Sequence, residues 1–149
     1  MTIKRLLVAN RGEIARRVFR TAKEMGIFTV AVYSDGDRDA PFVTDADLAI
    51  GLGGTTATES YLNSEKILDA AKSVGADAIH PGYGFLSENA EFAQAVSDAG
   101  LTWIGPPPAA IAAMGDKLAA KETMVGADVP TLPSVEVIDS TDIQAVGKE

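Results

Sequence analysis

The chain has 149 residues, 46 % of them apolar, which is enough for one well-filled core and indicates a single domain. Its formal net charge of −8 disfavours nonspecific binding to nucleic acid or to an anionic membrane surface, because neither polyanion is attracted to an acidic protein. With no cysteine and one histidine, the sequence excludes a disulfide framework, a thiolate zinc site and a cysteine nucleophile.

The apolar runs of the chain are short. The first, at residues 6–9, follows two cations and is too brief for the hydrophobic region of a signal peptide. No later run approaches the ~20 residues that span a bilayer. We therefore expect a cytoplasmic protein with no membrane partner and no nucleic-acid partner.

Strand-like runs alternate with helix-like stretches along the chain. The run at residues 6–9 is continuously apolar, which is typical of a strand buried on both faces. A helix is predicted at residues 13–25, and Asn10 with Glu13 forms a capping-box pattern at its start. A polar loop is expected at residues 34–45. Further strands are predicted at residues 27–32, 48–50, 76–79 and 101–104, and further helices at 64–74, 88–99, 109–114 and 117–125.

Glycine follows each of the three longer helices, at Gly26, Gly75 and Gly100, and is the usual stop signal there. Parallel neighbours in a sheet need a crossover, and helices are the usual crossover. The order of elements therefore predicts an α/β, Rossmann-like fold, a parallel sheet with helices on both faces. We expect one domain at residues 1–128 and an exit segment at residues 129–149.

Three loops are expected at the carboxyl ends of strands, where open α/β sheets bind ligands. In the first, at residues 10–13, the start of a helix and the Arg11 guanidinium could hold an anion. The alternative is an ordinary helix cap beside a solvated arginine.

The second loop follows the only histidine, His80. Gly82, Gly84 and Ser87 form a weak G-x-G-x-x-S match to the dinucleotide fingerprint, which belongs to the first strand-helix turn and not here. The glycines allow a flat polar ring to approach the backbone, with Tyr83 at its border. Ser87 could cap the following helix. The alternatives are a tight turn whose tyrosine packs on a neighbour, and a histidine that is a satisfied core residue.

The third loop places Lys117 in the first turn of a helix, against the preference of the helix dipole for anions. A phosphate or heterocycle beside the lysine would explain this position. The alternative is a lysine whose side chain is simply solvated. On the first helix, Arg16, Arg20 and Lys23 share a face, with Arg20 and Glu24 spaced to pair at i,i+4. Such a stripe is usually only a solvated surface.

Five segments together resemble a known family. They are LLVANRGEIARRVFR, SYLN, IHPGYGFLSEN, WIGPP and MGDKLAAK, in this order. The chain is similar, from Lys4 to about Pro133, to the N-terminal domain of biotin carboxylase, the pre-ATP-grasp domain found in acyl-CoA carboxylases and pyruvate carboxylase. HPGYGFLSEN is long and specific, whereas MGDK alone would be weak.

The resemblance implies a ligase that uses ATP, magnesium and bicarbonate to carboxylate biotin. Its partners would be the ATP-grasp and C-terminal domains of the same subunit, a biotin carboxyl carrier and a carboxyltransferase component, with a possible homodimer. The family's phosphate-binding glycine loop, magnesium-binding glutamates and bicarbonate-binding arginines would lie beyond Glu149. We therefore expect no catalytic residue, no metal site, no tightly bound cofactor and no activity in this chain alone.

The resemblance also assigns individual residues. Tyr83 and Gly84 would face the ureido ring of biotin, and Lys117 would contact ATP. The residues that match the helix bordering the homodimer interface are Arg17, Arg20 and Glu24. Four positions depart from the family's pattern and bear on the subfamily: Phe42 and Leu48 replace histidine and glutamate, and Asp128 and Ser134 replace glycines.

A second hypothesis needs no enzyme. A stand-alone binding or assembly module could present the basic face of its first helix to a partner. Continuation of the native reading frame past residue 149 into a glycine-rich ATP-grasp sequence would decide between the two.

Overall fold

The computed structural model describes residues 2–115 and 117–132 of the chain. It divides into two compact units, Met1–Ile111 and Ala112–Glu149, which we describe separately. Most of the predicted exit segment, with Ser134, lies outside the described residues. Among those residues, no helix is long and apolar enough to cross a membrane.

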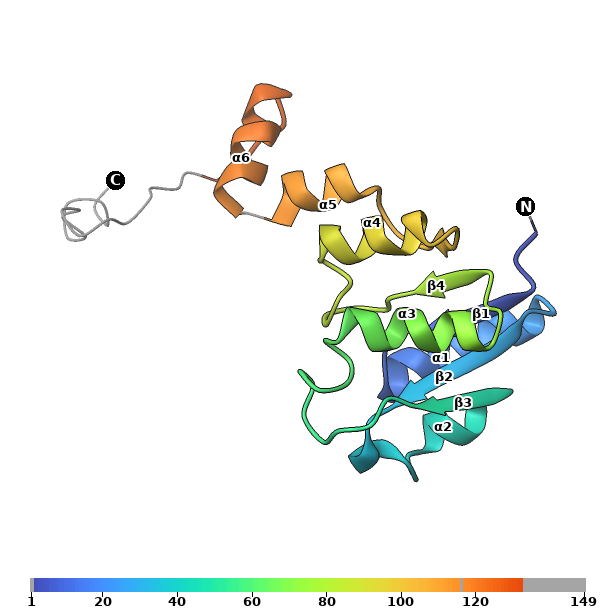
Figure 1. The fold of residues 1–149 in the computed structure, drawn as a ribbon. Coiled ribbons are helices and arrows are strands. Elements are labelled where there is room, and N and C mark those ends of the chain that lie inside the picture. Colours follow the sequence, from blue (N-terminus) through green and yellow to red (C-terminus); the bar gives the residue numbers. More distant parts are fainter. Residues whose placement is uncertain (1, 116, 133–149) are drawn as a thin grey trace. The chain divides into compact units, whose positions relative to one another are not determined.

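The first unit is built on a parallel sheet (Figure 1). All four strand pairings are parallel, and the strand order is β3-β2-β1-β4-β5. The α/β class and the parallel sheet predicted from the sequence are confirmed. The strands are β1 (Arg5–Val8), β2 (Phe28–Tyr33), β3 (Leu48–Gly51), β4 (Ala78–His80) and β5 (Thr102–Trp103).

Helices cover both faces of this sheet, as predicted. One buried cluster joins the sheet to α1 (Gly12–Glu24) and α2 (Pro41–Asp45). The other joins it to α3 (Ser64–Ser73) and α4 (Ala90–Asp98). The described residues also form a 3₁₀ turn η1 (Asp35–Asp37), α5 (Pro108–Gly115), and α6 (Lys117–Gly126) in the second unit.

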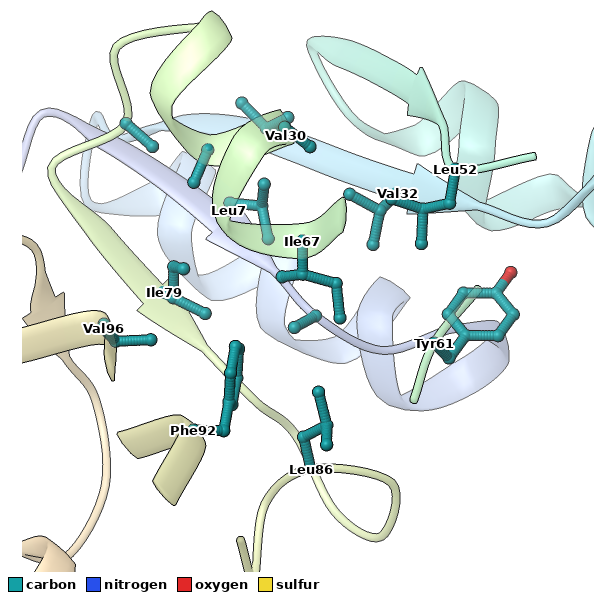
Figure 2. Close-up of a cluster of buried hydrophobic side chains, with 14 residues drawn as sticks. Leu7, Val30, Val32, Leu52, Tyr61, Ile67, Ile79, Leu86, Phe92 and Val96 are labelled. Carbon is teal, nitrogen blue, oxygen red and sulfur yellow. The ribbon is translucent and has the colours of Figure 1, made fainter. Parts of the chain in front are cut away.

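Alternation along β1 divides the core between the two faces. Leu7 belongs to the cluster with α3 and α4, while Leu6 and Val8 belong to the cluster with α1 and α2. Successive side chains of a strand point to opposite faces, so a central strand with both faces covered must be apolar throughout. Figure 2 shows Leu7 among the buried side chains of the cluster with α3 and α4.

The segment at residues 34–45, predicted to be a polar loop, contains η1 and α2 instead. Pro41 occupies the first helical position, which suits its fixed φ and missing N–H. Phe42 is only 1 % exposed and anchors this short helix in the core. The prediction missed α2 because five residues are too few to show helical periodicity.

The helix ends are partly as predicted. Gly26, Gly75 and Gly100 all have positive φ angles, which confirms their role as stop signals. The cap of α4 was predicted wrongly, because Asn89 and not Ser87 accepts the hydrogen bond from Phe92 N, at 2.7 Å.

In the second unit, α6 ends before a left-handed residue. This residue is Asp128, with φ +57°. Aspartate is among the few non-glycine residues that adopt this conformation readily.

The central strand gives a direct stability prediction. Leu7→Ala should lower the free energy of unfolding by about 2–5 kcal/mol, because it leaves a cavity at a fully buried position. Met25→Ala, at a side chain 70 % exposed, should change it by less than about 0.5 kcal/mol. Urea denaturation measures both, and equal losses in the two variants would contradict the described core.

Candidate functional site

The site lies where the strand order changes direction. From β1 the chain moves to β2 on one side of the sheet, and it later returns to β4 on the other side. Val8 and His80, the last residues of β1 and β4, are neighbours in the sheet. The loops that follow these two strands therefore meet at a topological switch point, where open α/β sheets bind ligands.

Asn10 joins the two loops. Its side chain is 1 % exposed, and its Nδ2 donates to the carbonyl oxygens of Pro81 and Tyr83, both at 2.8 Å. The predicted capping box is therefore wrong. The N-cap of α1 is Arg11, without a side-chain hydrogen bond, and Asn10 Oδ1 accepts from Arg11 N at 2.9 Å. The two carbonyls accept from Nδ2, and Oδ1 accepts from the adjacent Arg11 N instead of from an amide in the first turn of α1.

Gly82 and Gly84, in the loop after β4, differ in how closely other atoms approach them. Gly82 has φ +68°, and a Cβ there would lie 2.6 Å from Asn10 Nδ2. Gly84 has φ +66°, but no atom lies within 4 Å of the place where its Cβ would be. At Gly82 both the backbone conformation and the contact with Asn10 exclude a larger side chain. At Gly84 only the conformation does so, and the space above the backbone is open.

His80 supports the same loop. Its Nδ1 accepts a hydrogen bond from Gly82 N at 2.9 Å, so Nδ1 carries no proton in this arrangement. Its carbonyl oxygen accepts from Ala9 N at 2.8 Å. Burial lowers the pKa of His80 below its ordinary value of 6.5, because the charged imidazolium is the form that loses solvation. A structural role, the simpler of the sequence-based readings, agrees with this geometry.

The Tyr83 ring projects into solvent. Its side chain is 72 % exposed, so it is not packed against a neighbour among the described residues, as one sequence-based alternative expected. Beside it is an open pocket of about 410 Å³ lined by residues of both loops, including Gly84 and Gly12. An exposed aromatic next to an unobstructed glycine offers one edge of a site for a planar polar ring.

An aromatic and polar network holds the end of the loop. The rings of Tyr61 and Phe85 stack with their centroids 5.2 Å apart, and Phe85 has φ +46°. The Tyr61 hydroxyl donates to Asp37 Oδ2 at 2.7 Å and accepts from Ser34 N at 3.1 Å. Arg11 Nη1 donates to the same carboxylate at 3.2 Å. Sequence reasoning found no role for Tyr61 or Asp37, since these partners are far apart in the chain.

The ionisation states in this network are well defined. Burial alone would raise the pKa of Asp37, but hydrogen bonds from Tyr61, Arg11 and Ser34 hold it below its ordinary value. Burial, with the hydrogen bond to Asp37, raises the pKa of Tyr61 to about 12. The pair is therefore a carboxylate and a protonated phenol at neutral pH.

The basic face of α1 is partly neutralised by acidic residues. Arg16 forms an ion pair with Asp45, and Lys23 Nζ lies 3.1 Å from Asp47 Oδ1. Two of the three residues of the predicted stripe are thus bound to carboxylates of this chain. The third, Arg20, remains exposed.

The residues matched to an interface share this surface. Arg17, Arg20 and Glu24 are all exposed, and the two arginines border an open hollow of about 500 Å³. Within the part of the chain that the structure describes, no ion pair joins Arg20 to Glu24, so the pair predicted at i,i+4 is not formed.

Lys117 is the first residue of α6, in the second unit. This agrees with its predicted place in the first turn of a helix, although its side chain lies outside what the structure describes. Within residues 2–115 and 117–132, no group of three or more histidine or carboxylate side chains is placed to hold a metal ion.

The geometry defines a class of protein: an α/β domain whose switch point carries a glycine loop held by hydrogen bonds from a buried side chain. The family model described as "Biotin carboxylase, N-terminal domain" matches residues 2–111. The chain belongs to this family.

Similar proteins agree with this assignment. The mitochondrial methylcrotonoyl-CoA carboxylase subunit alpha of Oryza sativa is 61 % identical over 131 residues, 88 % of this chain and 18 % of that protein. Biotin carboxylase 1 of Bacillus subtilis is 50 % identical over 144 residues, 97 % of this chain and 32 % of that protein. Pyruvate carboxylase from Rhizobium etli matches in structure with a TM-score of 0.84 at 42 % identity, covering 90 % of this chain and 14 % of that one. The chain thus spans about a third or less of the relatives named here.

The two loop glycines give the next prediction. Gly82→Ala should be destabilising by about 2–5 kcal/mol, the sum of left-handed strain and a collision with Asn10. Gly84→Ala carries the strain alone and should cost about 1–2 kcal/mol. Urea denaturation of the two variants measures the difference. An equal cost would mean that Gly82 and Asn10 are not in close contact.

The lowered pKa of His80 predicts a pH dependence of stability. Between its folded pKa and 6.5 the unfolded chain binds more protons than the folded one, so stability should be constant above about pH 7 and decline as the pH falls through 6.5. Because the chain has one histidine, His80→Asn should remove this decline. Chemical denaturation at about pH 7.5 and about pH 5.5 measures it, and an unchanged pH dependence in the variant would exclude His80 as the cause.

Proposed function

We propose that this chain is the N-terminal domain of a biotin carboxylase, an enzyme that uses ATP and bicarbonate to carboxylate biotin. The observation that carries the proposal is the loop after β4, where exposed Tyr83 borders the open space over Gly84. Membership of the family supports it. The activity belongs to the complete carboxylase, and we expect no biotin-dependent ATP cleavage by these 149 residues alone.

Tyr83 and Gly84 are proposed to contact the ureido ring of biotin. The ring is flat and polar, and a glycine without a Cβ lets it approach the backbone closely. The Tyr83 ring would border it on one side, at the edge of the open pocket. Biotin accepts the carboxyl group when bound. The proposed role of Tyr83 and Gly84 is to hold and orient the biotin ring.

Lys117 is proposed to contact ATP. A lysine in the first turn of a helix gains from a neighbouring phosphate or heterocycle, which offsets its unfavourable position relative to the helix dipole. We assign magnesium to no described residue, because these side chains form no suitable group. One cation is too little for phosphoryl transfer, which depends on several positioned charges, so the rest of the ATP site is expected elsewhere in the enzyme.

The proposed partners follow from the size of the relatives. Since the chain spans about a third or less of them, we propose ATP-grasp and C-terminal domains in the same subunit, a biotin carboxyl carrier and a carboxyltransferase component. The relatives include mitochondrial subunits and bacterial biotin carboxylases, so cytoplasmic localisation stays a prediction.

The exposed basic residues of α1 suggest an interface as well. Arg17, Arg20 and Glu24 are proposed to border a homodimer contact, since two neighbouring cations of the stripe already have partners within the chain. The alternative, a stand-alone module that binds through this same helix face, is favoured only if the native protein lacks ATP-grasp sequence.

Two substitutions in the complete carboxylase subunit test the site. Tyr83→Ala should raise the KM for free biotin about tenfold and leave the KM for ATP nearly unchanged, because the side chain is exposed and carries little packing. Lys117→Ala should raise the KM for ATP and leave the KM for free biotin nearly unchanged. Steady-state ATP cleavage at varied biotin and ATP measures both, and equal effects on the two substrates would assign either residue a structural role.

Charge reversal tests the interface. Arg20→Glu should shift the complete subunit toward monomer, and the shift should weaken at high salt, since charges at an interface rim are screened. Arg38→Glu is a matched control, because Arg38 is also exposed and lies outside α1, after η1. Sedimentation velocity measures the oligomeric state. No change with Arg20→Glu would make that face a solvated surface.

A further inference from the structure

The backbone of the loop after β4 is unusual in conformation. Gly82, Gly84 and Phe85 have φ angles of +68°, +66° and +46°. The two glycines adopt this region without steric cost, but Phe85 has a side chain and is held there against its steric preference. The described hydrogen bonds within the loop are few: Gly82 N donates to His80 Nδ1, Ser87 N to Gly84 O and Asn89 N to Leu86 O.

The buried Asn10 side chain holds the loop through hydrogen bonds. Both of its described Nδ2 hydrogen bonds go to loop carbonyls, those of Pro81 and Tyr83, at 2.8 Å each. A carboxamide can satisfy two carbonyls with one nitrogen and still accept with its oxygen, as it does from Arg11 N. Because the side chain is buried, these bonds do not compete with water.

A second support lies at the far end of the segment. The ring of Phe85 stacks on Tyr61, and Tyr61 is itself 2 % exposed and hydrogen-bonded to Asp37. The loop is thus fixed on both sides of Tyr83 and Gly84, the two residues that stay open to solvent. Such an arrangement presents a rigid backbone where a ligand approaches, which lowers the entropy cost of binding.

We propose that Asn10 is a positioning residue for biotin, which holds the backbone of Tyr83 and Gly84 through the carbonyls of Pro81 and Tyr83. This inference rests on the proposed function. A role as helix cap does not account for Asn10, since Arg11 is the N-cap of α1. Burial alone does not account for it either, because the amide hydrogens point to two specific acceptors.

The matched test is an exchange of amide for carboxylate at two asparagines. Asn10→Asp keeps the shape but replaces the Nδ2 donor with an oxygen that faces two carbonyl oxygens. Asn63→Asp is the control, because the Asn63 side chain caps α3 by accepting from Lys66 N at 3.0 Å, which aspartate does equally well.

The first measurement uses this chain itself. Amide hydrogen exchange of Gly82 and Ser87, compared with the amides of β2, should accelerate at least about tenfold in Asn10→Asp and stay within about twofold in Asn63→Asp. If Asn10→Asp does not fold, Asn10→Ser keeps one donor and should give a smaller acceleration at the same two amides. Unchanged exchange in a folded variant would overturn the proposal.

The second measurement uses the complete carboxylase subunit. Asn10→Asp should raise the KM for free biotin about tenfold while the KM for ATP stays within about twofold. Faster loop exchange with an unchanged KM for biotin would overturn the positioning role. A wild-type subunit without biotin-dependent ATP cleavage would overturn the proposed function and the biotin part of this inference, while the exchange rates would still decide whether Asn10 holds the loop.

Discussion

The hydrogen bonds from the Asn10 amide to two carbonyls of the neighbouring loop are the contacts on which the candidate site depends. They join the residues after β1 to those after β4, two segments about seventy positions apart in sequence. The sheet brings the segments together, since β1 and β4 are parallel neighbours at the point where the strand order reverses. The loop then turns its carbonyls inward to the amide and leaves Tyr83 and Gly84 facing outward.

The rest of the first unit keeps this arrangement rigid. The two apolar clusters on either side of the sheet fix the positions of the strands, and therefore of the loops at their ends. The pair of Tyr61 and Asp37 extends the support from the core to Phe85. Tyr61 therefore links the core to the site, because it belongs both to a buried cluster and to the polar network with Asp37.

The sequence predicted the elements that depend on periodicity and stop signals, such as the run at residues 6–9 and the glycine after each longer helix. It did not reveal α2, which depends on the burial of Phe42 and spans only five residues. Tyr83 and Gly84 could be singled out because the loop motif is local. The role of Asn10 could not be predicted, because a helix cap and a loop clamp use the same residue at the same place, and only the long-range contact distinguishes them.

The most direct test is a crystal structure of the complete carboxylase subunit with free biotin bound. The account predicts that the ureido ring lies over Gly84 with Tyr83 at its border, while Asn10 Nδ2 still donates to the carbonyls of Pro81 and Tyr83. Biotin bound away from this loop, or a loop that has released Asn10 in the complex, would contradict it.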